Sequence, residues 1–512
     1  MKVKMSETKL FPQETSLLFP TLALFLLPII FLVTKHLKIS LSKSPPLPPG
    51  PFPWPILGNI LQLRNKPLHL TLARFAKTYR SDLISFKLGA QLVVVGSSRA
   101  AAMEMLKTHD RNLSARFVPH VLPAKSPQLN NFSIGWTFEC NDSWKNLRTI
   151  SRTELFSSKA IQSQACIREQ KVSEMLEIVR KMHGREVNLK NVAFATIYNI
   201  MSNILVSRDL VNLEHEILRG EIGGLLVRIM ELQSIPNVSD MYPWLGSLDL
   251  QSIRKRAMEG FDFSSKQWEA IVKERKELRR NSSSQQDFLD VMIQDGCSQN
   301  QINMLFPELL IAGTDSSVAT VEWTIAELVK NPKCMKMVQE ELEREIYGKG
   351  AIVTESDVPK LKYLEACVKE TLRLHPPGPL LIPRRAAESC TVMNYSIPKN
   401  SQVLINVWAI GRDPSYWEDP LVFKPERFLD SRLDFKGNDF EYLPFGGGRR
   451  ICPGWPMASK LVPLIVASLI HSFDWFLPKG KDIKELDMSE KRDVLLRKKE
   501  PLILIPKAKL ML

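Results

Sequence analysis

The stretch that decides the fold reads Phe445-Gly446-Gly447-Gly448-Arg449-Arg450-Ile451-Cys452-Pro453-Gly454 and lies near the C-terminal end of a 512-residue sequence. Glycine permits backbone conformations with φ > 0 and lets another group approach the main chain closely. An apolar run, Leu461 to Ile470, follows the loop. A cysteine presented in this way can reach a flat, bulky group, and a thiolate ligand allows a haem iron to cleave an O–O bond. The alternative from these residues alone is a glycine-rich turn whose cysteine is buried as a small hydrophobic side chain.

This stretch resembles the haem-binding loop of the cytochrome P450 monooxygenases, which has the pattern Phe-x-x-Gly-x-Arg-x-Cys-x-Gly. Every fixed position of that pattern is filled, by Phe445, Gly448, Arg450, Cys452 and Gly454. The resemblance implies a haem b cofactor bound by these residues, with the thiolate of Cys452 as the iron ligand. It also implies the fold of that family, which is mainly α with a minor β region.

The cysteines and the net charge indicate in which cellular compartment the protein lies and which class of partner it binds. The seven cysteines are scattered and form no C-x-x-C pair, so neither a zinc site nor a disulfide framework is predicted. A reducing compartment fits this usage best. The net charge of +14 is spread through the chain rather than gathered in one basic run. Spread charge of this kind is typical of a solvated surface, with attraction to anionic lipid or to an acidic protein as the alternative, and a nucleic-acid partner is not expected.

The N-terminal part predicts attachment to a membrane. Residues 17–34 form an apolar run without a charged residue, at the short end of the length that spans a bilayer. A cleaved signal peptide is the alternative, but Lys35, His36 and Lys38 precede the small residues that a cleavage site would need. We therefore expect a membrane anchor over 1–44 with its helix at 17–34, a proline-rich hinge over 45–59, and a haem-thiolate catalytic domain over 60–512.

The same resemblance gives these segments a location. Membrane-bound P450 enzymes of plants and animals carry a proline-rich hinge at this place, whereas the residues alone leave a disordered linker open. The resemblance implies a single-pass protein of the endoplasmic reticulum membrane with its catalytic domain in the cytosol.

Residues 301–329 are apolar on all sides and predict one long buried helix. Its middle, 312–317, reads AGTDSS and breaks that pattern, because glycine weakens a helix and a buried carboxylate needs a partner or water. Such local violations point to a functional site. The stretch resembles the family's oxygen-activation motif Ala-Gly-x-Asp-Thr-Thr, in which Gly313 would leave space for oxygen and Asp315 and Ser316 would relay protons. Ser316 replaces the usual threonine, which leaves room for a non-standard outcome such as a rearrangement; the alternative is a relaxed helix with Asp315 solvated.

Three further residues match family contacts to the haem propionates. Trp144 and Arg148 lie four residues apart, so a helix capped by Asp142 or Ser143 would put both on one face. The family's Trp-x-x-x-Arg pair reaches the propionates, and Arg384 matches another such contact. The alternative for the pair is an ordinary amphipathic helix with a basic edge.

A charged network is predicted beside the loop. Glu370 and Arg373 are spaced for pairing on one helix face, and Arg427 follows in the stretch Lys424 to Phe428. These residues match the family's Glu-x-x-Arg and Pro-Glu-Arg-Phe motifs, which imply a buried network that supports the cysteine loop. Taken alone, the first two would be a surface pair of little energetic value.

The chamber for the substrate is expected to be apolar. Its walls are predicted at 117–132, at 495–496 and at Leu380, Leu381 and Ile382, on a strand after Pro377. Such a chamber fits a small hydrophobic substrate with a few polar groups.

The resemblance covers nearly the whole chain and is greatest to plant microsomal enzymes of specialised metabolism, in the groups of N-methylcoclaurine hydroxylases, littorine mutases and geraniol hydroxylases. It implies a monooxygenase that takes O2, and electrons from NADPH through NADPH–cytochrome P450 reductase. We expect the substrate to be an alkaloid of benzylisoquinoline or tropane type, with littorine-type oxidation or rearrangement included. Three alternatives stay open: a geraniol-type monoterpenoid hydroxylase, a haem-thiolate isomerase or dehydratase that needs no reductase, and a membrane-anchored haem carrier without activity.

Overall fold

The structure is a computed structural model that describes residues 45–63, 67–220, 232–233, 235–279, 287–346, 352–491 and 494–509. The predicted membrane helix at 17–34 lies outside these ranges. Within them, every helix is too short or too polar to cross a bilayer. The segment 45–51 packs along the sheet: Ser85 N–H donates to Pro49 O at 2.9 Å, and Ser396 N–H donates to Pro46 O at 2.8 Å.

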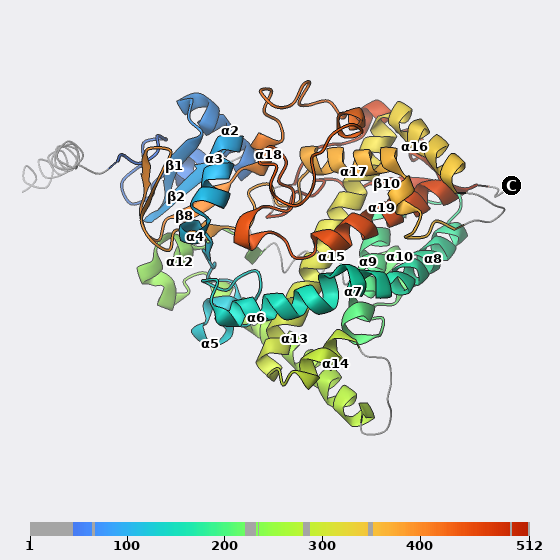
Figure 1. Cartoon of the computed structure of the whole chain (residues 1–512), viewed down its shortest axis with the longest axis horizontal. Helices are drawn as coiled ribbons and strands as arrows, with labels where there is room; N and C mark the ends of the chain where they lie inside the picture. The colour runs from blue at the N-terminus through green and yellow to red at the C-terminus, as the bar shows by residue number, and fades with distance from the viewer. Residues whose placement is uncertain are drawn as a thin grey trace, which may run out of the picture.

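Helix α15 (Gln299–Lys330) crosses the middle of the molecule (Figure 1). It begins two residues before the predicted range and ends one residue after it. Ser298 starts it with a capping box, in which its side chain accepts from Gln301 N–H and the Gln301 side chain accepts from Ser298 N–H. The prediction of a buried helix is confirmed, since most of its residues from Ile302 to Leu328 are buried. Around it pack α9 (Leu189–Val206), α13 (Ile253–Arg279), α17 (Lys362–Leu374) and α19 (Trp455–Ser472).

The remaining helices complete the helical part of the body. They are α2 (Leu68–Tyr79), α3 (Arg99–Met103), α4 (Asp110–Leu113), α5 (Pro127–Asn130), α6 (Asp142–Ser151), α7 (Ser158–Ser163), α8 (Ala165–Lys181), α10 (Leu213–Arg219), α12 (Val238–Met241), α14 (Phe288–Gln294), α16 (Pro332–Glu345) and α18 (Val407–Ile410). The large apolar core lies where α8, α9, α15, α17 and α19 meet.

The main sheet lies at one end of the molecule, on the left in Figure 1. Its five strands, in spatial order, are β1 (Leu83–Leu88), β2 (Gln91–Gly96), β8 (Gln402–Ile405), β5 (Arg384–Arg385) and β3 (Ala115–Arg116). The first two strands form a hairpin, with Gly89 at φ 58° in its turn. The short strands β3 and β5 pair in register so that Arg116 lies opposite Arg384.

Two small sheets lie elsewhere. One has the order β4 (Val187–Asn188), β10 (Ile503–Ala508), β9 (Phe473–Phe476), and the other pairs β6 (Cys390–Val392) with β7 (Tyr395–Ile397). The expectation of a strand over Leu380 to Ile382 is wrong. These residues form a turn in which Leu381 has φ 54°, and the strand begins only at Arg384.

Candidate functional site

A cavity of about 1280 Å³ lies between the cysteine loop and α15. It is larger than the roughly 300–1,000 Å³ of an ordinary small-molecule pocket, so there is room for a prosthetic group together with a substrate. Cys452 lies in its wall, with Phe445 on the same loop and Asp315 and Ser316 on α15. Of the expected chamber segments, 121–124, Leu381 to Ile382 and Leu495 contribute to the wall.

The loop before Cys452 owes its shape to its glycines. Gly446 has φ 71° and Gly448 has φ 67°. A Cβ at Gly448 would stand 2.4 Å from Leu106 O and 2.4 Å from an Asp110 oxygen, so no other residue fits there. The Phe445 carbonyl accepts from Cys452 N–H at 3.0 Å. The loop therefore folds back on itself and fixes the position of the cysteine.

The Cys452 thiol faces the cavity at the start of α19. Burial raises its pKa, while backbone N–H groups of Gly454 and Trp455 and the charge of Arg148 act against that rise. These groups would stabilise a thiolate, and donors to a ligating sulfur tune its electron donation to a metal. Gly454 is the residue just before α19, and it contributes through its backbone.

Four arginines converge on one side of the cavity wall: Arg116, Arg148, Arg384 and Arg450. Burial lowers the pKa of each, that of Arg450 to about 10, and for Arg116 the charges of Arg450 and Arg384 lower it further. Within the described ranges, only Arg384 among the four has a carboxylate partner, Asp110 at 3.3 Å. The other three donate to carbonyl oxygens, as Arg148 does to Ile451 O and Arg450 does to Thr137 O. This wall has an excess of positive charge.

Arg116 was missed by sequence reasoning. It stands alone in the chain without a recognisable motif, and its place beside Arg384 follows from the pairing of β3 with β5. Its guanidinium donates to Gly135 O and Ile382 O, both at 2.9 Å. No local signal would have identified it.

Trp144 lies under the arginines rather than in the cavity wall. Its indole N–H donates to Ile134 O at 2.8 Å, and its ring lies 4.6 Å from the Arg450 guanidinium. The expected helix is present as α6, but the cap is Asn141, whose side chain accepts from Trp144 N–H, not Asp142 or Ser143. In this structure Trp144 therefore supports Arg148 and Arg450 instead of reaching into the cavity.

The carboxylate of Asp315 has a cationic partner that the sequence did not reveal. Arg497 Nη2 donates to Asp315 Oδ2 at 2.6 Å, and both residues are buried. Lys498, the next residue along the chain, is buried as well. Ser316 Oγ donates to Ala312 O at 2.8 Å, and both residues line the cavity.

Gly313 has a packing contact that the sequence did not predict. It is absent from the cavity wall, and a Cβ at this position would meet Met201 Cε on α9 at 2.8 Å. The glycine thus lets α15 and α9 pack closely, and Ala312 forms the cavity wall at this level. That the missing side chain also leaves space for oxygen stays a prediction.

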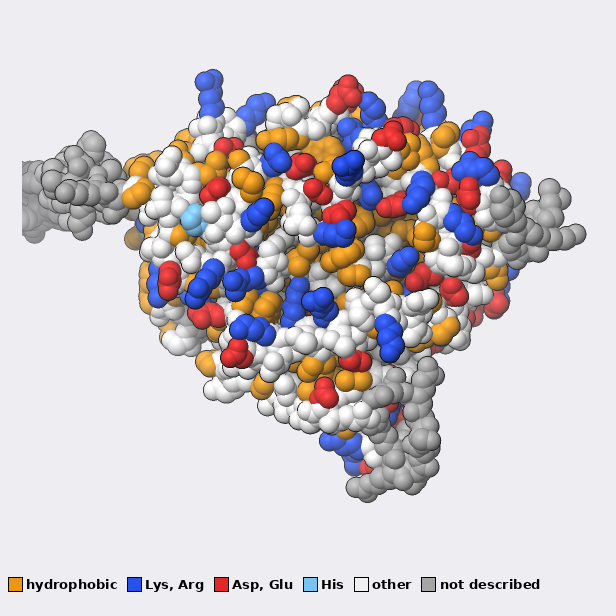
Figure 2. Space-filling view, in the orientation of Figure 1, with side chains coloured by type: hydrophobic (Ala, Val, Ile, Leu, Met, Phe, Trp, Pro, Cys, Tyr) orange, Lys and Arg blue, Asp and Glu red, His pale blue; other side chains and the backbone are white. Residues whose placement is uncertain are grey.

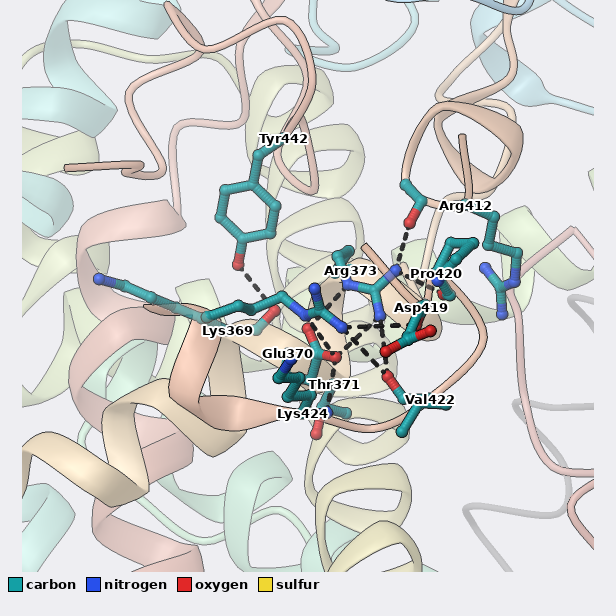
Figure 3. A network of polar contacts seen from close by, with 12 residues as sticks. Lys369, Glu370, Thr371, Arg373, Arg412, Asp419, Pro420, Val422, Lys424 and Tyr442 are labelled. Carbon is teal, nitrogen blue, oxygen red and sulfur yellow. Dashed lines mark hydrogen bonds and ion pairs between the residues drawn. The ribbon is translucent and has the colours of Figure 1, made fainter. Parts of the chain in front are cut away.

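Glu370 and Arg373 lie at the centre of a buried network (Figure 3), and Arg427 pairs with the same carboxylate. The Glu370 carboxylate accepts from Arg373 at 2.7 and 2.8 Å, from Arg427 Nε at 3.1 Å and from Lys424 N–H at 2.9 Å. The remaining donors of Arg373 reach carbonyl oxygens, among them Pro420 O at 2.8 Å. One carboxylate therefore holds two guanidinium groups and a backbone amide.

Aromatic rings connect this network to the loop. Trp417 lies 5.1 Å from the Arg373 guanidinium and packs edge-on against Tyr442. Tyr442 packs against Phe435, which meets Phe445 edge-on at 5.3 Å. Because Phe445 accepts the hydrogen bond from Cys452 N–H, a change in the network can reach the cysteine.

These residues fit a haem. The thiol of Cys452 in the wall of a cavity of about 1280 Å³ suits an iron porphyrin, and the unpaired guanidinium groups suit the two carboxylates at its edge. Of the predicted haem contacts, Phe445, Arg148, Arg384, Arg450 and Cys452 line the cavity, whereas Trp144, Gly448 and Gly454 are not among its lining residues.

Comparisons with known proteins agree with this geometry. The family model described as Cytochrome P450 matches residues 48–505. The chain is 47% identical over 485 residues to (S)-N-methylcoclaurine 3'-hydroxylase isozyme 1 of Papaver somniferum, and the aligned region covers 94% of this chain and 99% of that protein. It is 45% identical over 492 residues to corytuberine synthase of Coptis japonica (95% and 99% covered). It is 39% identical over 491 residues to geraniol 8-hydroxylase of Catharanthus roseus (94% and 98% covered).

Proposed function

Because the chain belongs to the cytochrome P450 family of haem-thiolate monooxygenases, we propose that it oxidises an alkaloid of benzylisoquinoline or tropane type. The observation that supports this most is the similarity over nearly the whole chain to a relative named for N-methylcoclaurine, at 47% identity against 39% for the geraniol hydroxylase. Oxidation or rearrangement of a littorine-type ester belongs to the same proposal.

The protein residues would divide the work of the site. When bound, the haem supplies the reduction and cleavage of O2 next to the substrate. Cys452 would hold it through Sγ, and Arg148, Arg384 and Arg450 would hold its carboxylates. If this assignment is right, the Cys452→Ala protein loses the red-shifted Soret band of a CO-bound thiolate haem, and a retained band would contradict it.

Asp315 and Ser316 would serve the proton supply. The Arg497 guanidinium holds the Asp315 carboxylate at the cavity wall, and the Ser316 hydroxyl lies on the same wall. A carboxylate and a hydroxyl placed in this way can hold a proton and pass it on through water. Gly313 would contribute by allowing α15 to approach α9.

The test is turnover with defined substrates. Microsomes that contain the chain and NADPH–cytochrome P450 reductase are incubated with NADPH and a panel of alkaloids and monoterpenoids. A product whose mass shows the gain of one oxygen atom on an alkaloid supports the proposal. A product that has lost two hydrogen atoms would show oxidative bond formation within the alkaloid instead of hydroxylation. Turnover of geraniol-type substrates alone would favour the monoterpenoid hydroxylase instead.

The other two alternatives have their own outcomes. An isomerase or dehydratase would convert its substrate without NADPH or reductase. A haem carrier would leave every substrate unchanged. NADPH consumption that depends on an alkaloid contradicts both.

We propose the expected division of the chain as well: an anchor over 1–44, a hinge over 45–59 and a catalytic domain over 60–512, at the endoplasmic reticulum membrane and facing the cytosol. A patch of exposed apolar side chains supports contact with lipid. Its members come from the segments 52–61 and 244–250 and are Phe52, Trp54, Ile56, Leu57, Leu61, Trp244, Leu248 and Leu250. Tyr242 Oη joins the two segments by donating to Ile56 O at 3.0 Å. Figure 2 shows apolar side chains at this end, to the left.

The electron donor would be the reductase, and the docking site would be basic. Figure 2 shows Lys and Arg side chains over the middle of one face, where the segment leading into α19 lies in Figure 1. Arg449, half exposed, and Lys460 belong to this region of the chain. Spread positive charge there would attract an acidic partner and raise its association rate.

A further inference from the structure

Glu308 is an acidic residue in the wall of the cavity that the monooxygenase reaction does not use. It lies on α15 four residues before Ala312 and eight before Ser316, and all three line the cavity. A spacing of four puts side chains on one helix face. The rise of 1.5 Å per residue separates Glu308 from Ser316 by about 12 Å along the axis. A molecule of several rings can cover that distance.

The carboxylate is held in place by the segment between α5 and α6. Gly135 N–H donates to Glu308 Oε1 at 2.5 Å, and the Ser133 side chain and the Ile134 backbone N–H are further donors. A Cβ at Gly135 would stand 2.8 Å from Oε1, so glycine is required for this contact. A carboxylate offers about four acceptor positions, so these three donors leave about one position for a ligand.

Its lack of an ion pair distinguishes Glu308 from the other acids of the cavity wall. Asp315 pairs with Arg497, Glu274 with Arg208 and Glu365 with Lys369. Among the described residues, no cation lies within 4.0 Å of the Glu308 carboxylate. The nearby Arg116 is engaged with Gly135 O and Ile382 O instead.

A buried carboxylate without a cation is costly. Burial raises the pKa of Glu308, and the hydrogen bonds from Ser133, Gly135 and Ile134 together with the charge of Arg116 offset this only in part. A cationic group of a ligand would remove the cost. An alkaloid carries such a group, since its aliphatic amine is protonated at neutral pH.

We propose that Glu308 binds the protonated amine of the substrate and thereby determines which carbon faces the oxidising centre. The inference rests on the proposed alkaloid oxidation and adds the residue that would recognise the substrate class. With the nitrogen held at Glu308, the carbon presented near Ser316 is one at the far end of the molecule.

The experiment compares a cation with a neutral molecule of the same shape. The probes are an N-methyl-1-benzyltetrahydroisoquinoline, which is protonated, and its 1-benzylisochroman counterpart, in which oxygen replaces the nitrogen. Dissociation constants are measured by equilibrium binding to the haem-loaded full chain. The variants are Glu308→Gln, which keeps an acceptor for Gly135 N–H, and Glu274→Gln, the same change at the exposed, paired acid of the wall.

We expect Glu308→Gln to weaken binding of the amine by roughly ten- to hundredfold, the range for a lost hydrogen bond to a charged group. The neutral probe should change by less than about twofold, and Glu274→Gln should leave both probes unchanged. Oxidation of the amine by Glu308→Gln should spread over several carbons. Equal losses for the two probes would mean a purely structural role and overturn the inference.

The wild-type protein gives a second reading that does not depend on a variant that folds. It should prefer the amine to the neutral probe, and equal affinities would overturn the assignment of Glu308. Alkaloid turnover in the panel assay together with equal affinities would leave the proposed function intact. Absence of both binding and turnover for every alkaloid would overturn the proposed function and this inference together.

Discussion

Replacement of Glu370 by glutamine tests the network beside the cysteine loop most directly. The side chains of Glu370 and Arg373 are both fully buried, and the same carboxylate accepts from Arg427. Glutamine keeps the size and one acceptor oxygen but leaves two guanidinium groups without a counter-charge. Removing one partner of a buried ion pair costs roughly 3–5 kcal/mol.

The effect on the unfolding temperature follows from the size of the domain. With an unfolding entropy of about 2.1 cal/mol/K per residue, a body of roughly 450 residues has about 0.9 kcal/mol/K, so the loss corresponds to about 3–5 °C. The assay is thermal unfolding at one fixed scan rate, together with the CO difference spectrum. We expect the thiolate-haem band to decay at a lower temperature, because aromatic contacts link the network to Phe445.

Glu418→Gln is the matched control. Glu418 pairs with Lys424 at 3.1 Å, but its side chain is 79% exposed. An exposed pair contributes about 0–1 kcal/mol, so the midpoint should move by about 1 °C or less. Equal midpoints for the two variants would refute the claim that burial of the Glu370 network stabilises the loop.

Three further predictions concern the loop, the proton supply and the response to pH. Gly448→Ala should abolish the thiolate-haem spectrum in protein that is otherwise folded by circular dichroism, because the new Cβ would stand 2.4 Å from Leu106 O at φ 67°; a normal spectrum would contradict this. Asp315→Asn should slow turnover by roughly a hundredfold while substrate binding changes little. Arg497→Leu should slow turnover more than Arg497→Lys, because leucine, unlike lysine, offers no cation to the Asp315 carboxylate. Unchanged turnover in Asp315→Asn would show that Asp315 has no part in the proton supply. Burial lowers the pKa of His375 from its ordinary 6.5, so the folded state keeps it neutral and stability is lost as the pH falls below that value. The loss should approach about 1.4 kcal/mol per pH unit, and His375→Gln should flatten the pH profile of the unfolding midpoint; a profile equally steep in that variant would assign the loss to other groups.

The sequence by itself determined the features that depend on local spacing. The glycines before Cys452 and the apolar length of 301–329 are properties of adjacent residues, and each predicted its element to within about two residues. The network of Glu370, Arg373 and Arg427 was found because both of its motifs appear in family order.

Only the tertiary structure decided which charges meet across the chain. Asp315 and Arg497 are 182 residues apart, and Glu308 meets Gly135 across 173 residues. Neither contact could be predicted from a repeating pattern in the sequence, because partners so far apart in the chain meet only through the packing of helices and loops. Periodic spacing predicts contacts only within one helix or strand. For the same reason the role of Gly313 in meeting Met201 and the engagement of the Trp144 indole with Ile134 O could not be read from the motifs that contain these residues.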